Sequence, residues 1–217
     1  MLLINFKNYE QSFGEFGLKI AKMAEEVHDE LGVEIGIVPN FLDLRTILGK
    51  VHIPIFAQHA DPFEPGSHTG SVLPSFLRNL GVNGVVLNHA EKRLRLDVLK
   101  DTFLLAKRYG LKTVVCADDE YSSKMVAALN PDYVAIEPPE LIGGDVSVVT
   151  KPEFVRKGIE SVKSISNSKV LVGAGIKSGE DVKKAIELGA DGVFVASAIC
   201  KASDPKSKIL ELAGGFR

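Results

Sequence analysis

The chain has 217 residues, 45% of them apolar, which is enough to bury a substantial core and excludes a disordered protein. The 26 Lys and Arg residues nearly balance the 28 Asp and Glu residues, and no basic cluster stands out, which argues against nucleic acid as a partner. The charge balance is compatible with a small charged ligand. No apolar run approaches the roughly 20 residues of a membrane span, and the first residues lack signal-peptide features. Cys116 and Cys200 are too few for a disulfide framework and lack metal-ligand spacing. We therefore expect a cytoplasmic protein with reduced thiols and no membrane contact.

Short runs rich in Val and Ile recur along the chain, bounded by Gly, Pro or Asn. They are continuous rather than alternating, which is typical of strands in a parallel sheet covered on both faces. The eight predicted strands are, in chain order, 2–6 (LLINF), 33–39 (VEIGIVP), 53–58 (IPIFAQ), 84–88 (GVVLN), 112–117 (KTVVCA), 133–137 (YVAIE), 169–173 (KVLVG) and 191–196 (DGVFVA).

Amphipathic stretches separate these runs. Several have Ser, Asp or Pro at the start and Gly or Asn at the end, as helices do. The predicted helices are 16–31, 41–49, 73–81, 96–110, 122–130, 152–165, 180–189 and 204–213.

Eight βα repeats without a linker or low-complexity tract predict one domain over residues 1–217. Such repeats close best as a TIM (β/α)8 barrel, an α/β fold of eight parallel strands ringed by helices; a doubly wound open sheet is the alternative. The second, third and fifth helices are short. A shortened outer ring leaves apolar surface to cover, which favours an oligomer.

Reactive groups of barrel enzymes lie at the C-terminal ends of the strands. The first predicted strand ends in Asn5, Phe6 and Lys7, His89 follows the fourth, and Glu137 ends the sixth. Asn5 and Lys7 are two residues apart, so they share one strand face. Taken singly, these residues have simpler explanations, namely a solvated lysine, a structural histidine and an ion-paired carboxylate. Their convergence at one mouth of a barrel indicates a site.

Small residues follow the last two strands. The segment 173–175 (GAG) leaves backbone N–H groups uncovered, and Ala196 and Ser197 open the last helical segment with further donors. Loops after strands 7 and 8 are the common phosphate site of barrels, because oriented amides attract anions. Tight βα turns are the structural alternative, but within a barrel we favour a phosphate site.

These residues resemble the triosephosphate isomerase family, in particular its short archaeal-type members. The resemblance covers almost the whole chain. It rests on Asn5-Phe6-Lys7 (Asn-x-Lys), 87–91 (LNHAE, with His-x-Glu), 137–143 (EPPELIG, catalytic Glu and lid), 58–70 (QHADPFEPGSHTG), 173–192 (GAGIKSGEDVKKAIELGADG) and 195–197 (VAS).

The resemblance implies interconversion of dihydroxyacetone phosphate and glyceraldehyde 3-phosphate, in glycolysis and gluconeogenesis, without cofactor or metal. Glu137 would be the base that moves a proton between adjacent carbons, and it would need a dry site. His89 would polarise the substrate oxygens as a neutral imidazole, a state known for this family rather than worked out from these residues. A helix beginning near Ala90 would disfavour its charged form. Lys7 would offset phosphate and enediolate charge, with Asn5 orienting it.

The resemblance also implies substrate contacts and a lid. The expected substrate-binding residues are Asn5, Phe6, Lys7, Ile142, Gly143, Gly175, Ala196 and Ser197. Pro138 and Pro139 stiffen one end of the lid, while Gly143 and Gly144 can absorb its movement at the other. Glu91 resembles a supporting carboxylate behind the site; the alternative is an acid that stabilises a helix N-terminus.

The loop from Gln58 to Gly70 is expected to insert into a neighbouring copy, giving a homodimer or homotetramer. Its residues His59, Asp61 and His68 raise the alternative of a metal site. Their spacing is not a ligand signature, however, and the prolines and glycines between them are typical of a shaped projecting loop.

Two positions depart from the family pattern. Ala90 stands where many members carry Ser, and Gly144-Asp145 stands where archaeal relatives usually carry Thr-Gly. They affect the resting base and the pace of the lid rather than the reaction.

Two other functions compete with the isomerase. A Schiff-base aldolase needs a lysine deep on a middle or later strand, which the chain does not offer. A phosphometabolite-binding protein built on an inactive isomerase has no need of the base Glu137.

Overall fold

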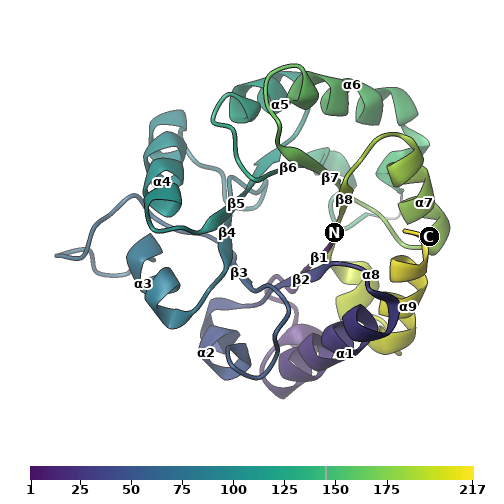
Figure 1. Cartoon of the computed structure of the whole chain (residues 1–217), viewed down its shortest axis with the longest axis horizontal. Helices are drawn as coiled ribbons and strands as arrows, with labels where there is room; N and C mark the ends of the chain where they lie inside the picture. Colours follow the sequence, from purple (N-terminus) through teal and green to yellow (C-terminus); the bar gives the residue numbers. More distant parts are fainter. Residues whose placement is uncertain (145) are drawn as a thin grey trace.

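The computed structural model describes residues 1–144 and 146–217. Eight parallel strands form one sheet in the order β2-β1-β8-β7-β6-β5-β4-β3. A parallel bridge between Ile37 and Ile55 joins the two outer strands of this order, so the sheet closes on itself. The barrel prediction is confirmed, with helices ringing the sheet (Figure 1). The strands are β1 (Leu2–Asn5), β2 (Ile35–Val38), β3 (Phe56–Ala57), β4 (Gly84–Leu87), β5 (Lys112–Ala117), β6 (Tyr133–Ile136), β7 (Lys169–Val172) and β8 (Gly192–Val195).

All eight predicted helices are confirmed, and the second, third and fifth are short. A separate helix of four residues, α8, follows β8, so Ala196 and Ser197 do not lead directly into the final helix as expected. The helices are α1 (Glu15–Leu31), α2 (Leu44–Ile47), α3 (Pro74–Leu80), α4 (Leu96–Arg108), α5 (Glu120–Ala127), α6 (Pro152–Lys163), α7 (Gly179–Glu187), α8 (Ser197–Cys200) and α9 (Pro205–Gly214).

Local sequence signals set several helix ends. Asp119 and Ser122 form a reciprocal cap at the start of α5, and Ser178 and Asp181 do the same for α7. Gly32 ends α1 in the left-handed region, with φ 67°. These ends fix where each helix returns the chain to the sheet.

The barrel interior is filled by side chains from alternate strand positions. One buried cluster consists of Met1, Leu3, Val38, Phe56, Val86, Val114, Cys116, Tyr133, Ala135, Leu171 and Phe194. A larger apolar cluster packs the outer strand faces against the helices. Because side chains alternate along a strand, Asn5 continues the inward face of Leu3, and Glu137 continues that of Ala135. The sheet therefore delivers an amide and a carboxylate to the C-terminal mouth.

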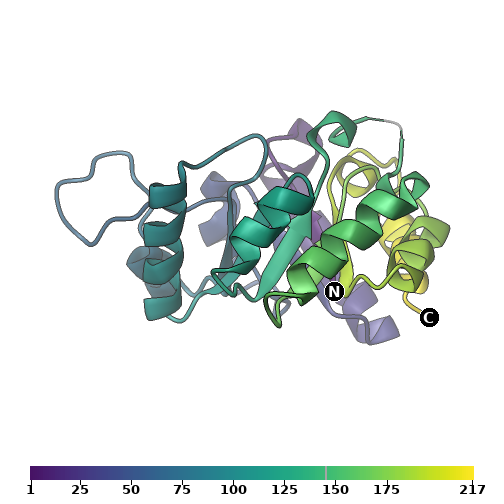
Figure 2. The ribbon, with the colours of Figure 1, turned by 90° about the horizontal axis from the view of Figure 1, so that it is seen from above.

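The segment between β3 and α3 extends well away from the barrel (Figure 2). Two hydrogen bonds close its base, Asp61 N–H to the Val72 carbonyl (2.8 Å) and Val72 N–H to the Asp61 carboxylate (2.7 Å). The projecting loop thus has a fixed base. Within residues 1–144 and 146–217, no helix has the length and apolarity to cross a membrane.

Candidate active site

Glu137 is buried at the end of β6, with 7% of its surface exposed. Its Oε2 has no hydrogen-bond partner among the described residues. Burial raises the pKa of this carboxyl to about 8, against the opposing attraction of Lys7. Gly173 makes room for it, since a Cβ there would lie 2.7 Å from Glu137 Oε1. Glu137 is therefore a desolvated carboxylate at the barrel mouth, and such a group is suited to accept a proton.

His89 faces this carboxylate, with Nε2 3.5 Å from Glu137 Oε2. Its other nitrogen, Nδ1, accepts the backbone N–H of Glu91 at 3.1 Å. A nitrogen that accepts a hydrogen bond carries no proton, so the ring proton lies on Nε2, toward Glu137. Burial and the charge of Lys7 lower the pKa of His89 to about 4. The ring is a neutral donor aimed into the site.

The prediction that a helix beginning near Ala90 keeps His89 neutral is wrong. Ala90 and Glu91 form a turn, and α4 begins only at Leu96, so no helix N-terminus acts on His89. The pKa of His89 is lowered mainly by desolvation and secondly by the positive charge of Lys7. For the same reason Glu91 is not a helix N-terminal acid.

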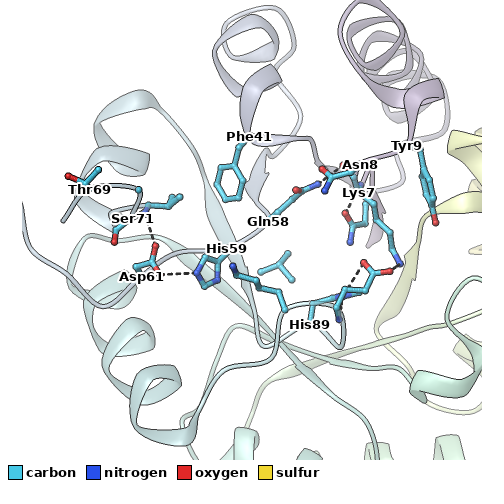
Figure 3. Close-up of a pocket in the computed structure, with 16 residues that line it drawn as sticks. Lys7, Asn8, Tyr9, Phe41, Gln58, His59, Asp61, Thr69, Ser71 and His89 are labelled. Carbon is cyan, nitrogen blue, oxygen red and sulfur yellow. Dashed lines mark hydrogen bonds and ion pairs between the residues drawn. The ribbon is translucent and has the colours of Figure 1, made fainter.

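Lys7 reaches the site from the turn after β1. Its backbone is left-handed, with φ 48°, and its N–H donates to Asn5 Oδ1 at 3.0 Å. Its ammonium group pairs with Glu91 Oε1 at 2.8 Å, and the Gln58 amide donates to its carbonyl at 2.8 Å. Figure 3 shows the Lys7 side chain running from this turn toward His89. The contact between Asn5 and Lys7 is thus made to the Lys7 backbone and not to its ammonium group.

One pocket brings together the three expected reacting groups and most of the expected substrate contacts. Its lining includes Asn5, Lys7, His89, Glu137, Ile142, Gly143, Gly175, Ala196 and Ser197. Phe6 is the exception: it is fully buried in the core, and its carbonyl accepts the Ser12 hydroxyl at 2.7 Å. The structure does not bring the Phe6 side chain to the pocket.

The segment predicted to act as a lid lines this pocket through Ile142 and Gly143. A short 3-10 helix, Pro139–Leu141, follows Glu137, and Gly143 is left-handed with φ 74°. The far end lies against Gly175, where a Cβ would come within 2.1 Å of the Val146 carbonyl oxygen. Gly144 also lines the pocket, whereas Asp145, the second unusual hinge residue, lies outside the described residues.

Sequence reasoning missed two aromatic walls of the pocket, Tyr9 and Phe194. Phe194 meets the His89 ring edge-on, with centroids 6.2 Å apart. Tyr9 carries the Lys201 ammonium 4.4 Å from its ring centroid. Strand alternation identifies Phe194 as inward-facing, but Tyr9 lies beyond the strand, where alternation gives no signal.

A second cavity, of about 760 Å³, opens between Lys7, His89 and the base of the projecting loop (Figure 3). His59 contacts Asp61 there, with Nε2 3.1 Å from Oδ1. The other oxygen of Asp61 accepts the Val72 N–H, while His68 stacks on Phe63 at 4.1 Å. His59 therefore contacts the loop through Nε2, while its buried Nδ1 has no hydrogen-bond partner among the described residues.

Comparisons with known proteins agree with this arrangement. A family model described as triosephosphate isomerase matches residues 1–213. The triosephosphate isomerase of Methanocaldococcus jannaschii is 47% identical over 214 residues, which cover 98% of each chain. That of Methanothermus fervidus is 44% identical, with 98% of this chain and 96% of the relative covered. That of Methanopyrus kandleri is 44% identical over 219 residues, covering 99% and 97%.

Proposed function

The chain belongs to the triosephosphate isomerase family, and we propose that Glu137, His89 and Lys7 carry its chemistry in one barrel domain over residues 1–217. The protein is an isomerase that interconverts dihydroxyacetone phosphate and glyceraldehyde 3-phosphate, a step of glycolysis. The observation that carries the assignment of roles is the pair of Glu137 Oε2 and His89 Nε2, 3.5 Å apart. Burial pushes their pKa values in opposite directions, which separates a base from a neutral donor.

Glu137 is the base. Its ionised carboxylate removes a proton from the carbon beside the substrate carbonyl and returns it to the neighbouring carbon. The pocket supplies few hydrogen bonds to weaken this carboxylate, because Oε2 has no partner among the described residues. A carboxylate with a raised pKa holds the abstracted proton well, which lowers the barrier to the enediolate.

His89 polarises the substrate oxygens. The Nε2 proton faces the site because Nδ1 is occupied by the Glu91 N–H. A neutral imidazole donates to the developing oxyanion without itself carrying a full charge that must be solvated. The low pKa keeps the ring in this form at neutral pH.

Lys7 and the small-residue turns hold the charged end of the substrate. The ammonium group is mostly buried, with 11% of its side chain exposed, so its attraction for an anion is weakly screened. Gly175 and Ser197 offer backbone N–H groups in the same pocket. Closure of the lid brings Ile142 and Gly143 to the substrate and excludes water from the enediolate.

A coupled assay that follows glyceraldehyde 3-phosphate tests these roles. Glu137→Asp shortens the base by one methylene and withdraws its oxygens by about 1 Å, which lowers kcat by roughly 100-fold or more. Glu140→Asp, one residue into the lid helix on an exposed side chain, is the matched control and retains activity. Full activity of the Glu137→Asp enzyme would refute the assignment.

We also propose that the chain self-associates through the loop from Gln58 to Gly70. The loop projects from the barrel, and the cavity of about 760 Å³ beside its base can receive the same loop of a second copy. A two-fold pairing places each loop in the other's cavity. Large apolar side chains are also exposed on the protein, including Phe16 (61% exposed), Leu42 (78%) and Phe76 (57%), and covering such surface favours assembly.

The oligomeric mass tests this proposal. Replacing residues 65–68 with two glycines removes the tip and keeps the bonds between Asp61 and Val72 that close the base. Light scattering is expected to show an assembly for the wild type and a monomer for the shortened chain. An unchanged mass of the shortened chain contradicts the proposal.

A further inference from the structure

We propose that Asn88 is a positioning residue that fixes both the direction and the tautomer of His89. The inference rests on the proposed role of His89 as the neutral donor. Asn88 is the first residue after β4, and its backbone is left-handed, with φ 59°. Its side chain forms hydrogen bonds with Cys116 and Leu94, and neither of these two residues lines the substrate pocket.

The left-handed backbone redirects His89. Val86 belongs to the interior cluster and Leu87 to the outer one, so regular alternation would point Asn88 inward and His89 outward. His89 instead lines the pocket and meets Phe194, a member of the interior cluster. The change of hand at Asn88 accounts for this break in the pattern, and asparagine tolerates the left-handed region better than most residues.

The Asn88 amide then holds the loop that carries His89. Its Nδ2 donates to the Cys116 carbonyl on β5 at 3.1 Å. Its Oδ1 accepts the Leu94 N–H, also at 3.1 Å. One side chain therefore joins the two ends of the segment 88–94 and ties that segment to the neighbouring strand. An ion pair between Arg93 and Asp118 fastens the same loop a second time.

This loop contains the bond that selects the tautomer. The Glu91 N–H reaches His89 Nδ1 at 3.1 Å, and the Lys92 N–H reaches the His89 carbonyl at 2.7 Å. If the loop loosens, Nδ1 loses its donor and can take the ring proton. Nε2 would then present a lone pair to the carboxylate of Glu137 and to the substrate oxygens. An Nε2 without its proton cannot donate, so turnover falls while the phosphate contacts stay in place.

Asn88→Gly tests the amide apart from the backbone, since glycine keeps the left-handed conformation and removes only the side chain. Asn130→Gly is the matched control: Asn130 is also left-handed, with φ 54°, but it is exposed and lies before β6, at the opposite end of the barrel. Measurements are kcat and KM in the coupled assay, and nitrogen-15 NMR of histidine-labelled protein. The His89 signals are identified by their loss in His89→Gln.

The expected result for Asn88→Gly is a 10- to 100-fold lower kcat, as for a displaced reacting group, with KM within about twofold of wild type. Its His89 spectrum shifts from the Nε2-protonated form toward a mixture of tautomers. Asn130→Gly leaves kcat and the spectrum unchanged. Wild-type kcat together with a wild-type His89 spectrum in Asn88→Gly would overturn the proposal.

Asn88→Asp keeps the test informative if the glycine variant does not fold. Aspartate retains an acceptor for the Leu94 N–H and loses the donor to the Cys116 carbonyl. We expect the kcat and the His89 tautomer mixture of Asn88→Asp to lie between those of wild type and those expected for Asn88→Gly. A wild-type spectrum together with wild-type kcat in Asn88→Asp would also overturn the proposal. Because the spectrum reports the tautomer directly, it separates failure of this inference from failure of the catalytic roles, which the Glu137→Asp assay reports.

Discussion

Gly173 sits where any larger residue must displace the proposed base. A Cβ built on Gly173 lies 2.7 Å from Glu137 Oε1 and 2.7 Å from the Phe194 carbonyl oxygen. The second contact is with backbone of β8, which has little freedom to move. In Gly173→Ala the carboxylate has to yield.

The size of that movement sets the expected loss. Ordinary contact begins at 3.4 Å, so Oε1 has to retreat by about 0.7 Å, and the carboxylate that faces His89 through Oε2 moves with it. A displacement of 1 Å at the reacting atoms can cost about 100-fold in rate, and on that scale we expect kcat to fall by roughly 10- to 100-fold. Overpacking also costs stability, about 1–3 kcal/mol.

Gly84→Ala separates these two effects. Gly84 is also a strand glycine, and its Cβ would lie 2.5 Å from the Phe56 ring and 2.6 Å from the Lys112 carbonyl oxygen. It opens β4 at the end of the barrel away from the site. Thermal unfolding should show both variants destabilised, while the coupled assay shows a loss of kcat only for Gly173→Ala. Wild-type kcat in a folded Gly173→Ala enzyme, or an equal loss in Gly84→Ala, would refute the reasoning.

Three further outcomes follow from the same geometry. Lys7→Met removes an attraction of about 4 kcal/mol for a charge about 4 Å away. We therefore expect kcat/KM to fall roughly 100- to 1,000-fold and inhibition by inorganic phosphate to weaken. Unchanged phosphate affinity would show that Lys7 is structural. Glu137 must be ionised to act, and its pKa is raised to about 8, so kcat/KM rises about tenfold per pH unit below that value and levels off above it; a plateau already present at pH 5 contradicts this. Gly175→Ala brings a Cβ within 2.1 Å of the Val146 carbonyl oxygen, which displaces the far end of the lid; product analysis should show more free phosphate released from the enediolate, and a wild-type product ratio contradicts it.

The strands were predictable because each is a continuous apolar run, and their order follows from the βα rhythm. Their lengths were less so. The run 53–58 gives a regular strand of only two residues, Phe56–Ala57, because β3 pairs with β4 over those residues and meets β2 only at the bridge through Ile55. Pairing depends on the neighbouring strands, which the run itself does not contain.

The site was predictable to the extent that it depends on strand alternation. Asn5 and Glu137 each lie two positions after an inward-facing residue, Leu3 and Ala135. Strand alternation read from the sequence is therefore enough to bring them together. His89 breaks the alternation, and its place depends on a left-handed Asn88 that no apolar pattern signals. Phe6 shows the opposite error: the family motif includes it, but its side chain belongs to the core.

The charges of the pocket explain why small-residue turns are needed. Lys7 is paired with Glu91 at 2.8 Å, so its positive charge is already partly offset before an anion arrives. Ionised Glu137 adds a negative charge, and the phosphate of a triose phosphate adds up to two more. His89, held neutral, contributes none. The remaining positive potential has to come from backbone dipoles. The same pocket is lined by Ala174, Gly175, Ala196 and Ser197, whose side chains are too small to cover their N–H groups. A further charged side chain in the pocket would shift the pKa values of His89 and Glu137, and an added positive charge would make Glu137 a weaker base. Backbone dipoles carry no net charge, so phosphate binding and proton transfer can share one buried pocket.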